Sequence, residues 1–167
     1  WLQDVARVIS KHNLPIHWTT PSGFVVRQEY KKASHRTIKT RFQGSLIYLP
    51  MYEETDKIDS KKQASAIAPN FVHSLDASAL MYTLEAAKLQ DVTSFAMVHD
   101  SFATHAADTE VLASTIRSSF VTMYECFDVL NNFRDEVQAQ CPEELPPVPE
   151  CGNLDIRQVL LSDYFFA

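Results

Sequence analysis

The chain contains 167 residues, 46% of them hydrophobic, and carries a formal net charge of −6. This length fits one ordinary domain, and the apolar content is sufficient for a buried core. The sequence has no run of about 18 apolar residues, which excludes a helical membrane span. The three cysteines lack metal-ligand spacing and are odd in number, so we expect free thiols in a reducing compartment.

The charges are distributed unevenly along the chain. Residues 1–62 contain 11 Lys and Arg against 6 Asp and Glu, whereas residues 63–167 contain 4 against 15. Such a basic segment either forms a solvated surface or binds phosphates. The acidic chain as a whole argues weakly against nucleic-acid binding, so charge alone leaves both interpretations open. The densest cations are Arg27, Lys31, Lys32, Arg36, Lys39 and Arg41.

The first part of the chain is expected to contain one helix and two β-hairpins. The first dozen residues have amphipathic helical spacing that ends near His12. β-rich runs on both sides of Pro21-Ser22-Gly23 predict one hairpin, and a second is expected over residues 34–50 with its turn near Gly44. Residues 53–63 are charged and show no apolar periodicity, which predicts a mobile linker.

The rest of the chain is expected to be mainly helical. Two long helices are predicted over residues 69–90 and 109–140, with Asn70 and Asp108 as their N-caps, because these residue types favour that position. The segment 142–149 contains four prolines, which lack amide donors, and is expected to be irregular. Between the two helices the pattern predicts a short hairpin.

The tip of this short hairpin is Val98-His99-Asp100-Ser101, between two apolar runs. A carboxylate held at a hairpin tip is rigid and exposed, so Asp100 has the properties of a ligand for a hard cation. Beside a second carboxylate it would hold the metal pair used in phosphoryl or nucleotidyl transfer, but the sequence reveals no obvious second carboxylate. The competing interpretation is structural, since Asp favours turns by bonding nearby amides.

A set of motifs occurs in a characteristic order over nearly the whole chain. The strongest are the segments 68–76, which reads Ala-Pro-Asn-Phe-Val-His-Ser-Leu-Asp, and 94–102, which contains the His-Asp turn. In this order they resemble the C-terminal part of the single-subunit DNA-dependent RNA polymerases of bacteriophages, with the mitochondrial RNA polymerases as more distant relatives. Further matches are residues 18–24, 28–32, 152–155 and 164–167.

The resemblance implies catalytic roles for Asp100 and His99 and a nucleic-acid-binding role for His73. Asp100 looks like one of the two palm aspartates that bind catalytic Mg²⁺ in that family. His99 looks like the adjacent residue that shapes the turn and approaches the nascent RNA end. His73 looks like the family's helix histidine, which faces the hybrid of template and RNA. Without the resemblance, a buried structural histidine is the more common use of such a residue.

The resemblance also implies nucleic-acid contacts and a C-terminal foot. Residues 34–50 look like the hairpin that enters the promoter major groove and reads bases. Residues 152–167 look like the foot, in which the free carboxylate of the terminal Phe166-Ala167 pair lies near the active site. The candidate nucleic-acid-binding side chains of the hairpin are Arg36, Lys39 and Arg41.

The predicted fold is α+β, with a polymerase palm-type β-hairpin packed by long helices over residues 69–141 and an extended basic β-hairpin. The implied activity is Mg²⁺-dependent, template-directed nucleotidyl transfer by a DNA-directed RNA polymerase. Its implied partners are promoter and template DNA, nascent RNA and nucleoside triphosphates, without a membrane. We expect a monomer, encoded by a phage or prophage, in the cytoplasm of a bacterial host.

The chain lacks parts that the family uses for catalysis. The second metal-binding aspartate and the fingers helix, whose lysine and tyrosine handle the nucleotide, lie upstream in the family. Trp1 stands inside a predicted helix, so we expect a palm and fingers fragment of a longer enzyme that is inactive alone. The alternatives are a non-catalytic DNA-binding remnant and the palm of a family A DNA polymerase. In family A DNA polymerases the residue after the turn Asp is typically Glu, whereas here it is Ser101.

Overall fold

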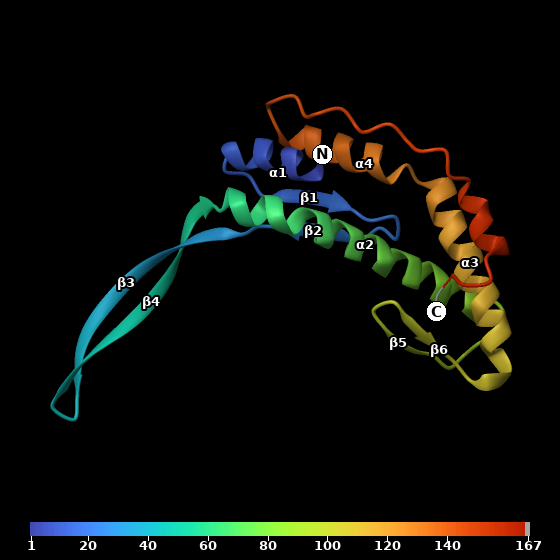
Figure 1. Cartoon of the computed structure of the whole chain (residues 1–167), viewed down its shortest axis with the longest axis horizontal. Coiled ribbons are helices and arrows are strands. Elements are labelled where there is room, and N and C mark those ends of the chain that lie inside the picture. Colours follow the sequence, from blue (N-terminus) through green and yellow to red (C-terminus); the bar gives the residue numbers. More distant parts are fainter. Residues whose placement is uncertain (166–167) are drawn as a thin grey trace.

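The computed structural model describes residues 1–165, in which one long helix connects three separate antiparallel hairpins. Figure 1 shows α2 running through the middle of the molecule, with β3–β4 projecting from one end and β5–β6 beside its other half. This arrangement confirms the α+β prediction. The elements are α1 (Leu2–Lys11), β1 (Ile16–Thr19), β2 (Val25–Gln28), β3 (Lys31–Phe42), β4 (Ser45–Ile58), α2 (Ser60–Lys88), β5 (Ala96–Val98), β6 (Ser101–Ala103), η1 (Ala106–Asp108), α3 (Thr109–Cys126), α4 (Val129–Gln140) and η2 (Ile156–Leu161).

The main core lies between α1, β1, α4 and the first half of α2. At its centre the ring of Phe133 packs edge-on against Phe71 and Trp18, with centroids 4.9 and 5.8 Å away. Trp1 adds a further edge contact to Phe133 at 5.9 Å. The indole of Trp18 also donates a hydrogen bond to the Ser74 hydroxyl at 3.0 Å. Aromatic packing therefore fixes α4 and the N-terminal segment against α2.

The hairpin β3–β4 is longer than the sequence predicts. Its predicted turn near Gly44 is confirmed, because Gln43 and Gly44 have φ angles of 50° and 85°, and positive φ at both central residues is typical of a type I′ turn. The predicted linker over residues 53–63 is wrong, since residues 53–58 continue β4 and α2 begins at Ser60. Most of the ribbon is exposed on both faces, so no apolar periodicity marks the strand in the sequence.

The helix α2 begins nine residues before its predicted start at Pro69. Asp59 is the N-cap, and its carboxylate accepts hydrogen bonds from the amides of Lys61 and Lys62, both at 3.1 Å. Pro69 lies within the helix between buried Ile67 and Phe71, and this packing on both sides stabilises the helix despite the missing amide. The helix therefore continues without a break from the end of the β3–β4 hairpin to Lys88.

Asn70, the predicted N-cap, instead joins a polar network at the root of the hairpin. Its side-chain amide donates to the side-chain oxygen Oε1 of Gln28 at 2.8 Å and to the Tyr30 hydroxyl at 3.3 Å. Gln28 is buried and donates to the side chain of Gln63 at 2.8 Å, while Gln63 donates to the backbone oxygen of Gln28 at 3.0 Å. Reciprocal bonds of this kind satisfy the buried amides and fix β2 against α2.

The predicted helix over residues 109–140 is in fact two helices. α3 ends at Cys126, and the chain bends at Phe127 before α4 begins at Val129. Asp128 caps the start of α4, since its carboxylate accepts a hydrogen bond from the backbone amide of Asn131. Because hydrogen bonds from Asn131 stabilise the carboxylate, the pKa of Asp128 is lowered. Helical spacing continues across the bend, so the sequence pattern does not reveal it.

Asn13 connects the end of α1 to the base of the hairpin. Its φ of 58° is in the left-handed region, which Asn tolerates better than most residues. The side chain donates to the Asp56 carbonyl at 2.9 Å and accepts from the Ile58 amide at 2.8 Å. These two bonds attach the end of β4 to the body of the protein.

We expect Asn13→Ala to loosen this attachment. Alanine is strained at positive φ and removes both side-chain bonds, so hydrogen exchange at the Ile58 amide should become faster than in the unmodified protein. Asn13→Gly is the matched variant, because it relieves the strain but still lacks the bonds. An unchanged exchange rate at Ile58 in both variants would show that the Asn13 side chain does not hold the hairpin.

Within residues 1–165, no helix is both long and apolar enough to cross a membrane.

Candidate active site and nucleic-acid interface

The His-Asp turn has the geometry that the sequence predicts. β5 and β6 pair through Met97 with Phe102 and Val98 with Ser101, which leaves His99 and Asp100 as the two turn residues. His99 has a φ of 54°, a left-handed conformation that is uncommon for residues other than Gly but that His adopts more often than most. Both side chains of the turn are exposed. The carboxylate of Asp100 is therefore accessible on a short, sharply bent support.

This turn and the middle of α2 line one cavity of about 700 Å³. The structure thus brings His73 together with His99 and Asp100, which are 26 and 27 residues further along the chain. On the helix, the lining residues recur at intervals of three and four, so they share one face of α2. The complete lining is His73, Asp76, Ala77, Leu80, Met81, His99 and Asp100.

Among the ionisable residues that line this cavity, Asp76 is the one that the sequence interpretation did not assign to the site. It lies one helical turn after His73, and that spacing is the signal in the sequence that could have found it. Tyr124 of α3 is partly buried, and burial, followed by the charge of the nearby Asp76 carboxylate, raises the pKa of its phenol. The cavity therefore has two carboxylates in its wall, Asp76 from the helix and Asp100 from the turn.

The donor chemistry fits one part of a magnesium site. Mg²⁺ prefers carboxylate oxygens and usually keeps several waters, and the exposed Asp100 offers such an oxygen at the cavity wall. Among residues 1–165, no group of three or more His, Cys, Asp and Glu side chains is placed to hold a metal ion. Asp100 therefore fits as a contributor to a site that needs further ligands.

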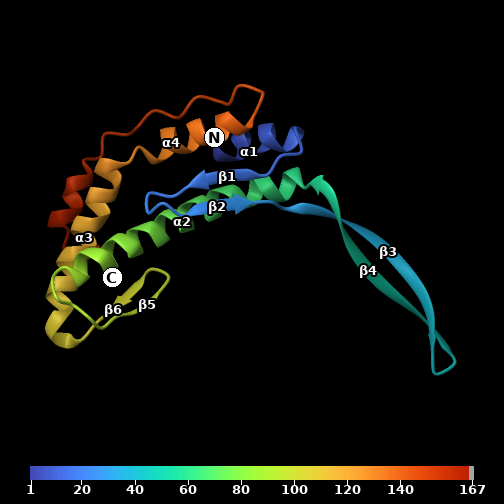
Figure 2. The ribbon, with the colours of Figure 1, turned by 180° about the vertical axis from the view of Figure 1, so that it is seen from behind.

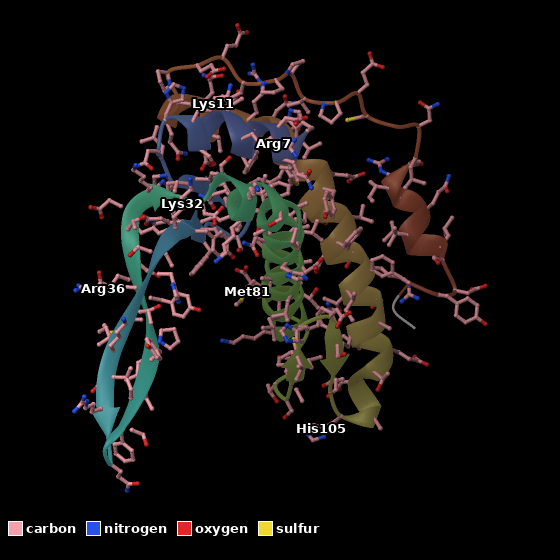
Figure 3. All side chains as sticks on the ribbon, turned by 60° about the vertical axis from the view of Figure 1, so that its left-hand side comes forward. Arg7, Lys11, Lys32, Arg36, Met81 and His105 are labelled. Atoms are coloured by element: carbon pink, nitrogen blue, oxygen red, sulfur yellow. The ribbon has the colours of Figure 1, made fainter. Side chains whose placement is uncertain are left out.

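A second cavity, of about 630 Å³, adjoins the first along α2 and shares Ala77 and Met81 with it. Figure 3 shows Met81 on the side of α2 that faces the β3–β4 hairpin. The turn between β1 and β2 forms another wall, where the Tyr82 hydroxyl donates to the Pro21 carbonyl at 3.0 Å. Burial raises the pKa of the Tyr82 phenol.

The candidate nucleic-acid-binding cations lie apart from these cavities, on the projecting hairpin. Figure 2 shows β3–β4 projecting from one end of α2, while β5–β6 lies near the other end. Both hairpins lie on the same side of α2. The side chains of Arg36, Lys39 and Arg41 are exposed, and none forms an ion pair with any residue in 1–165. Their positive charge is therefore available to an external partner.

The C-terminal segment lies along α3 as far as the structure describes it. Arg117 of α3 donates to the Ser162 carbonyl at 3.1 Å, and the ring of Phe165 packs against Phe120 with centroids 5.0 Å apart. The predicted foot residues Phe166 and Ala167 lie outside the described residues. Their expected position near the active site stays a prediction.

Comparison with known proteins identifies the family. The family model for DNA-dependent RNA polymerase matches residues 1–145. The chain therefore belongs to the phage-type, single-subunit DNA-dependent RNA polymerases, a family of nucleotidyltransferases. This result confirms the family expected from the motifs and sets aside the family A DNA polymerase alternative.

The chain is similar over almost its whole length to polymerases of plant organelles. It is 44% identical over 167 residues to the mitochondrial DNA-directed RNA polymerase 1 of Nicotiana sylvestris and 42% identical to that of Arabidopsis thaliana. In both cases the match covers 99% of this chain but only 16% of the relative. A shorter Nicotiana tabacum sequence, DNA-directed RNA polymerase 1A, is 44% identical over 160 residues, which cover 95% of this chain and 99% of that sequence.

These relatives do not support a bacteriophage source. We expected a bacteriophage source from motifs that phage and organellar enzymes share. These motifs therefore could not distinguish the two groups. The relatives named above are plant proteins, two of them mitochondrial by name. The bacterial cytoplasm expected from the sequence stays a prediction that none of these findings tests.

Proposed function

We propose that this chain is the C-terminal part of a DNA-directed RNA polymerase that catalyses template-directed nucleotidyl transfer. The observation that carries the proposal is the cavity that joins His73 of α2 to the His99-Asp100 turn. Three residues that the family resemblance marks as catalytic or hybrid-facing line one space, although they come from two segments of the chain. A chain that matches about one sixth of its longer relatives needs the rest of the enzyme to complete this site.

In the proposed mechanism, Asp100 is a ligand for Mg²⁺. When bound, the metal neutralises charge that develops on the attacking and leaving oxygens of nucleotidyl transfer. The short turn between β5 and β6 limits the movement of the carboxylate, and the left-handed conformation of His99 fixes the direction in which Asp100 points. The remaining carboxylate ligands come from the upstream part of the enzyme.

The two histidines are proposed to contact the nucleic acid. His99 approaches the growing RNA end, because it is adjacent to Asp100 in the turn. His73 faces the hybrid of template and RNA from α2, and its ring nitrogens are suited to bond base or sugar edges. Met81 and Leu80 line the same cavity as the two histidines and offer apolar surface to the nucleic acid.

The remaining partners follow from the same proposal. The β3–β4 hairpin contacts promoter DNA, since a two-stranded ribbon fits the major groove and its cations suit phosphates. Nucleoside triphosphates are the substrates, and the full-length enzyme works as a monomer. Phe166 and Ala167 form the foot near the active site.

Primer extension tests the proposed function. We expect the full-length protein that contains this chain to extend an RNA primer on a DNA template with Mg²⁺ and nucleoside triphosphates, and the isolated 167-residue chain to make no RNA. The reason is that one Asp on one hairpin supplies only part of a two-metal site. Robust synthesis by the isolated chain, or none by the full-length protein, would contradict the proposal.

A further inference from the structure

We propose that the second cavity beside α2 binds an unpaired base of the template DNA strand, which stacks on the ring of Phe24. This assignment rests on the proposed function, because a template strand is bound only if the parent protein is a polymerase. It also goes beyond that function, since neither the motifs nor the family resemblance gives this cavity or Phe24 a role.

The lining of the second cavity suits a flat, uncharged ring. Its volume of about 630 Å³ lies within the range of small-molecule sites. Phe24, Val26 and Met81 supply apolar walls. Within residues 1–165, Glu85 is the one charged residue that lines the cavity. A carboxylate repels a phosphate but not a neutral base, so the cavity favours a base whose phosphates stay outside.

Phe24 presents an exposed ring on a fixed backbone. It is 71% exposed, although its amide donates to the Thr20 hydroxyl at 3.1 Å and its carbonyl accepts from the Thr20 amide at 2.8 Å. Gly23 has a φ of 82°, and this left-handed conformation turns the chain back toward α2. A ring held in this way loses little conformational freedom when a partner stacks on it, which favours binding.

Hydroxyl groups hold the turn that contains Phe24 against α2. The hydroxyls of Ser22 and of buried Ser78 share a hydrogen bond at 3.1 Å, and Ser22 also bonds the Thr20 hydroxyl at 3.0 Å. The Tyr82 hydroxyl donates to the carbonyl of the turn residue Pro21 at 3.0 Å. The two walls of the cavity, one from the turn and one from α2, therefore keep a fixed separation.

The second cavity lies beside the candidate active site around the circumference of α2. Successive residues of a helix point about 100° apart, so His73 lines the first cavity and Ser74 lines the second. Ala77 and Met81 belong to both cavities. Because Ala77 has a short side chain, the ridge between the cavities is low there. A strand that contacts His73 can therefore place a neighbouring base against Phe24.

An unpaired template base is the occupant that fits this position. In template-directed synthesis the newest RNA bases are paired with the template, whereas the template continues beyond the paired region. Its unpaired bases have free faces, and every base can stack on an aromatic side chain. The cost of taking one base out of the stack is small when the strand is already single. Phe24 therefore has a suitable partner next to the site of synthesis.

Variants of Phe24 in the full-length polymerase test the site. Phe24→Ala removes the ring, Phe24→Leu keeps apolar bulk without a ring, and Phe24→Trp keeps an aromatic surface. Val25→Ala is the matched control, because Val25 is 62% exposed and, among the described residues, is absent from the lining of both cavities. The partner is an RNA primer annealed to a longer DNA template. Its dissociation constant is measured by anisotropy, and 2-aminopurine at successive unpaired template positions reports a base that leaves the DNA stack.

We expect the unmodified polymerase to raise 2-aminopurine fluorescence at one unpaired template position. Phe24→Ala and Phe24→Leu should abolish this rise and weaken binding about fivefold or more, which is the lower end for loss of one base–aromatic stack. Phe24→Trp should retain both the rise and the affinity. Val25→Ala should match the unmodified protein. Thermal unfolding temperatures should be similar in all variants, because the Phe24 ring is exposed.

Three outcomes would overturn the assignment. Unchanged affinity and fluorescence in Phe24→Ala would show that no template base stacks there. A lower unfolding temperature for Phe24→Ala, without a loss of template binding, would show that another segment of the polymerase fills the cavity. A response of 2-aminopurine in the RNA primer, but not in the template, would assign the cavity to RNA. Primer extension by the unmodified protein, measured in parallel, reports separately on the proposed polymerase function.

Discussion

Replacing Asp100 with Asn in the full-length polymerase is expected to lower the rate of RNA synthesis about a hundred- to a thousand-fold. Asparagine occupies nearly the same volume and tolerates turns, so the β5–β6 hairpin should keep its shape. It lacks the negative charge that a Mg²⁺ ligand contributes, so stabilisation of the transition state is lost. Binding to duplex DNA should be unchanged, because the hairpin proposed to contact DNA projects from the other end of α2 (Figure 1).

The matched control for this prediction is Asp135→Asn. Asp135 is a 76% exposed carboxylate on α4, and within residues 1–165 its ion pairing is limited to a 3.8 Å contact with the neighbouring Arg134. The same chemical change there should leave the rate of synthesis at the level of the unmodified enzyme. Single-turnover primer extension at saturating nucleotide measures the chemical step in both variants. If Asp100→Asn retains more than about a tenth of the normal rate, Asp100 is not a metal ligand in the sense proposed.

The His-Asp turn was predictable because local sequence determines it. Val98 and Phe102 stand in apolar runs on each side of two turn residues, and a hairpin of this length needs no distant contact to be recognised. The position of this turn beside His73 could not be predicted in the same way. The motifs placed both residues in one family, but only the folded course of α2 and of the loop to β5 brings them to one cavity.

The start of α2 shows where local signals mislead. Pro69 and Asn70 read as a helix start, because proline favours the first turn and asparagine favours the N-cap. The packing of Ile67 and Phe71 in the core overrides that preference, and Asn70 serves the polar network with Gln28 instead. The true cap, Asp59, stood in a charged segment that looked like a linker. Its bonds to the Lys61 and Lys62 amides became evident only in the structure.

The assignment of side chains to the two faces of the β3–β4 hairpin depends on register. A sequence shows that Arg36, Lys39 and Arg41 are close together, but alternation assigns faces only when the strand is known to be unbroken over that stretch. The structure has a regular ladder from Ala33 to Phe42, and its single irregularity lies between Lys31 and Ala33. Once the register is known, the pairing of Lys39 with Tyr48 follows directly.

The second prediction of large effect concerns the core. Phe133→Ala is expected to lower the free energy of unfolding by about 3–5 kcal/mol, the usual cost of truncating a buried Phe. Phe133 is 2% exposed and contacts three other aromatic rings, so its removal leaves a cavity at the junction of α4, β1 and α2. Urea unfolding of the 167-residue chain, followed by tryptophan fluorescence, measures the change because Trp1 and Trp18 both face the altered site.

Phe42→Ala is the control for this core prediction, since Phe42 lies near the hairpin turn and is 64% exposed. Its truncation removes the same atoms without opening a cavity, so the free energy of unfolding should change by no more than about 0.5 kcal/mol. A loss below about 1 kcal/mol for Phe133→Ala would mean that the aromatic cluster does not hold α4 on α2 in solution. In that case the isolated chain would lack the support that positions α2, and with it His73, for the site proposed above.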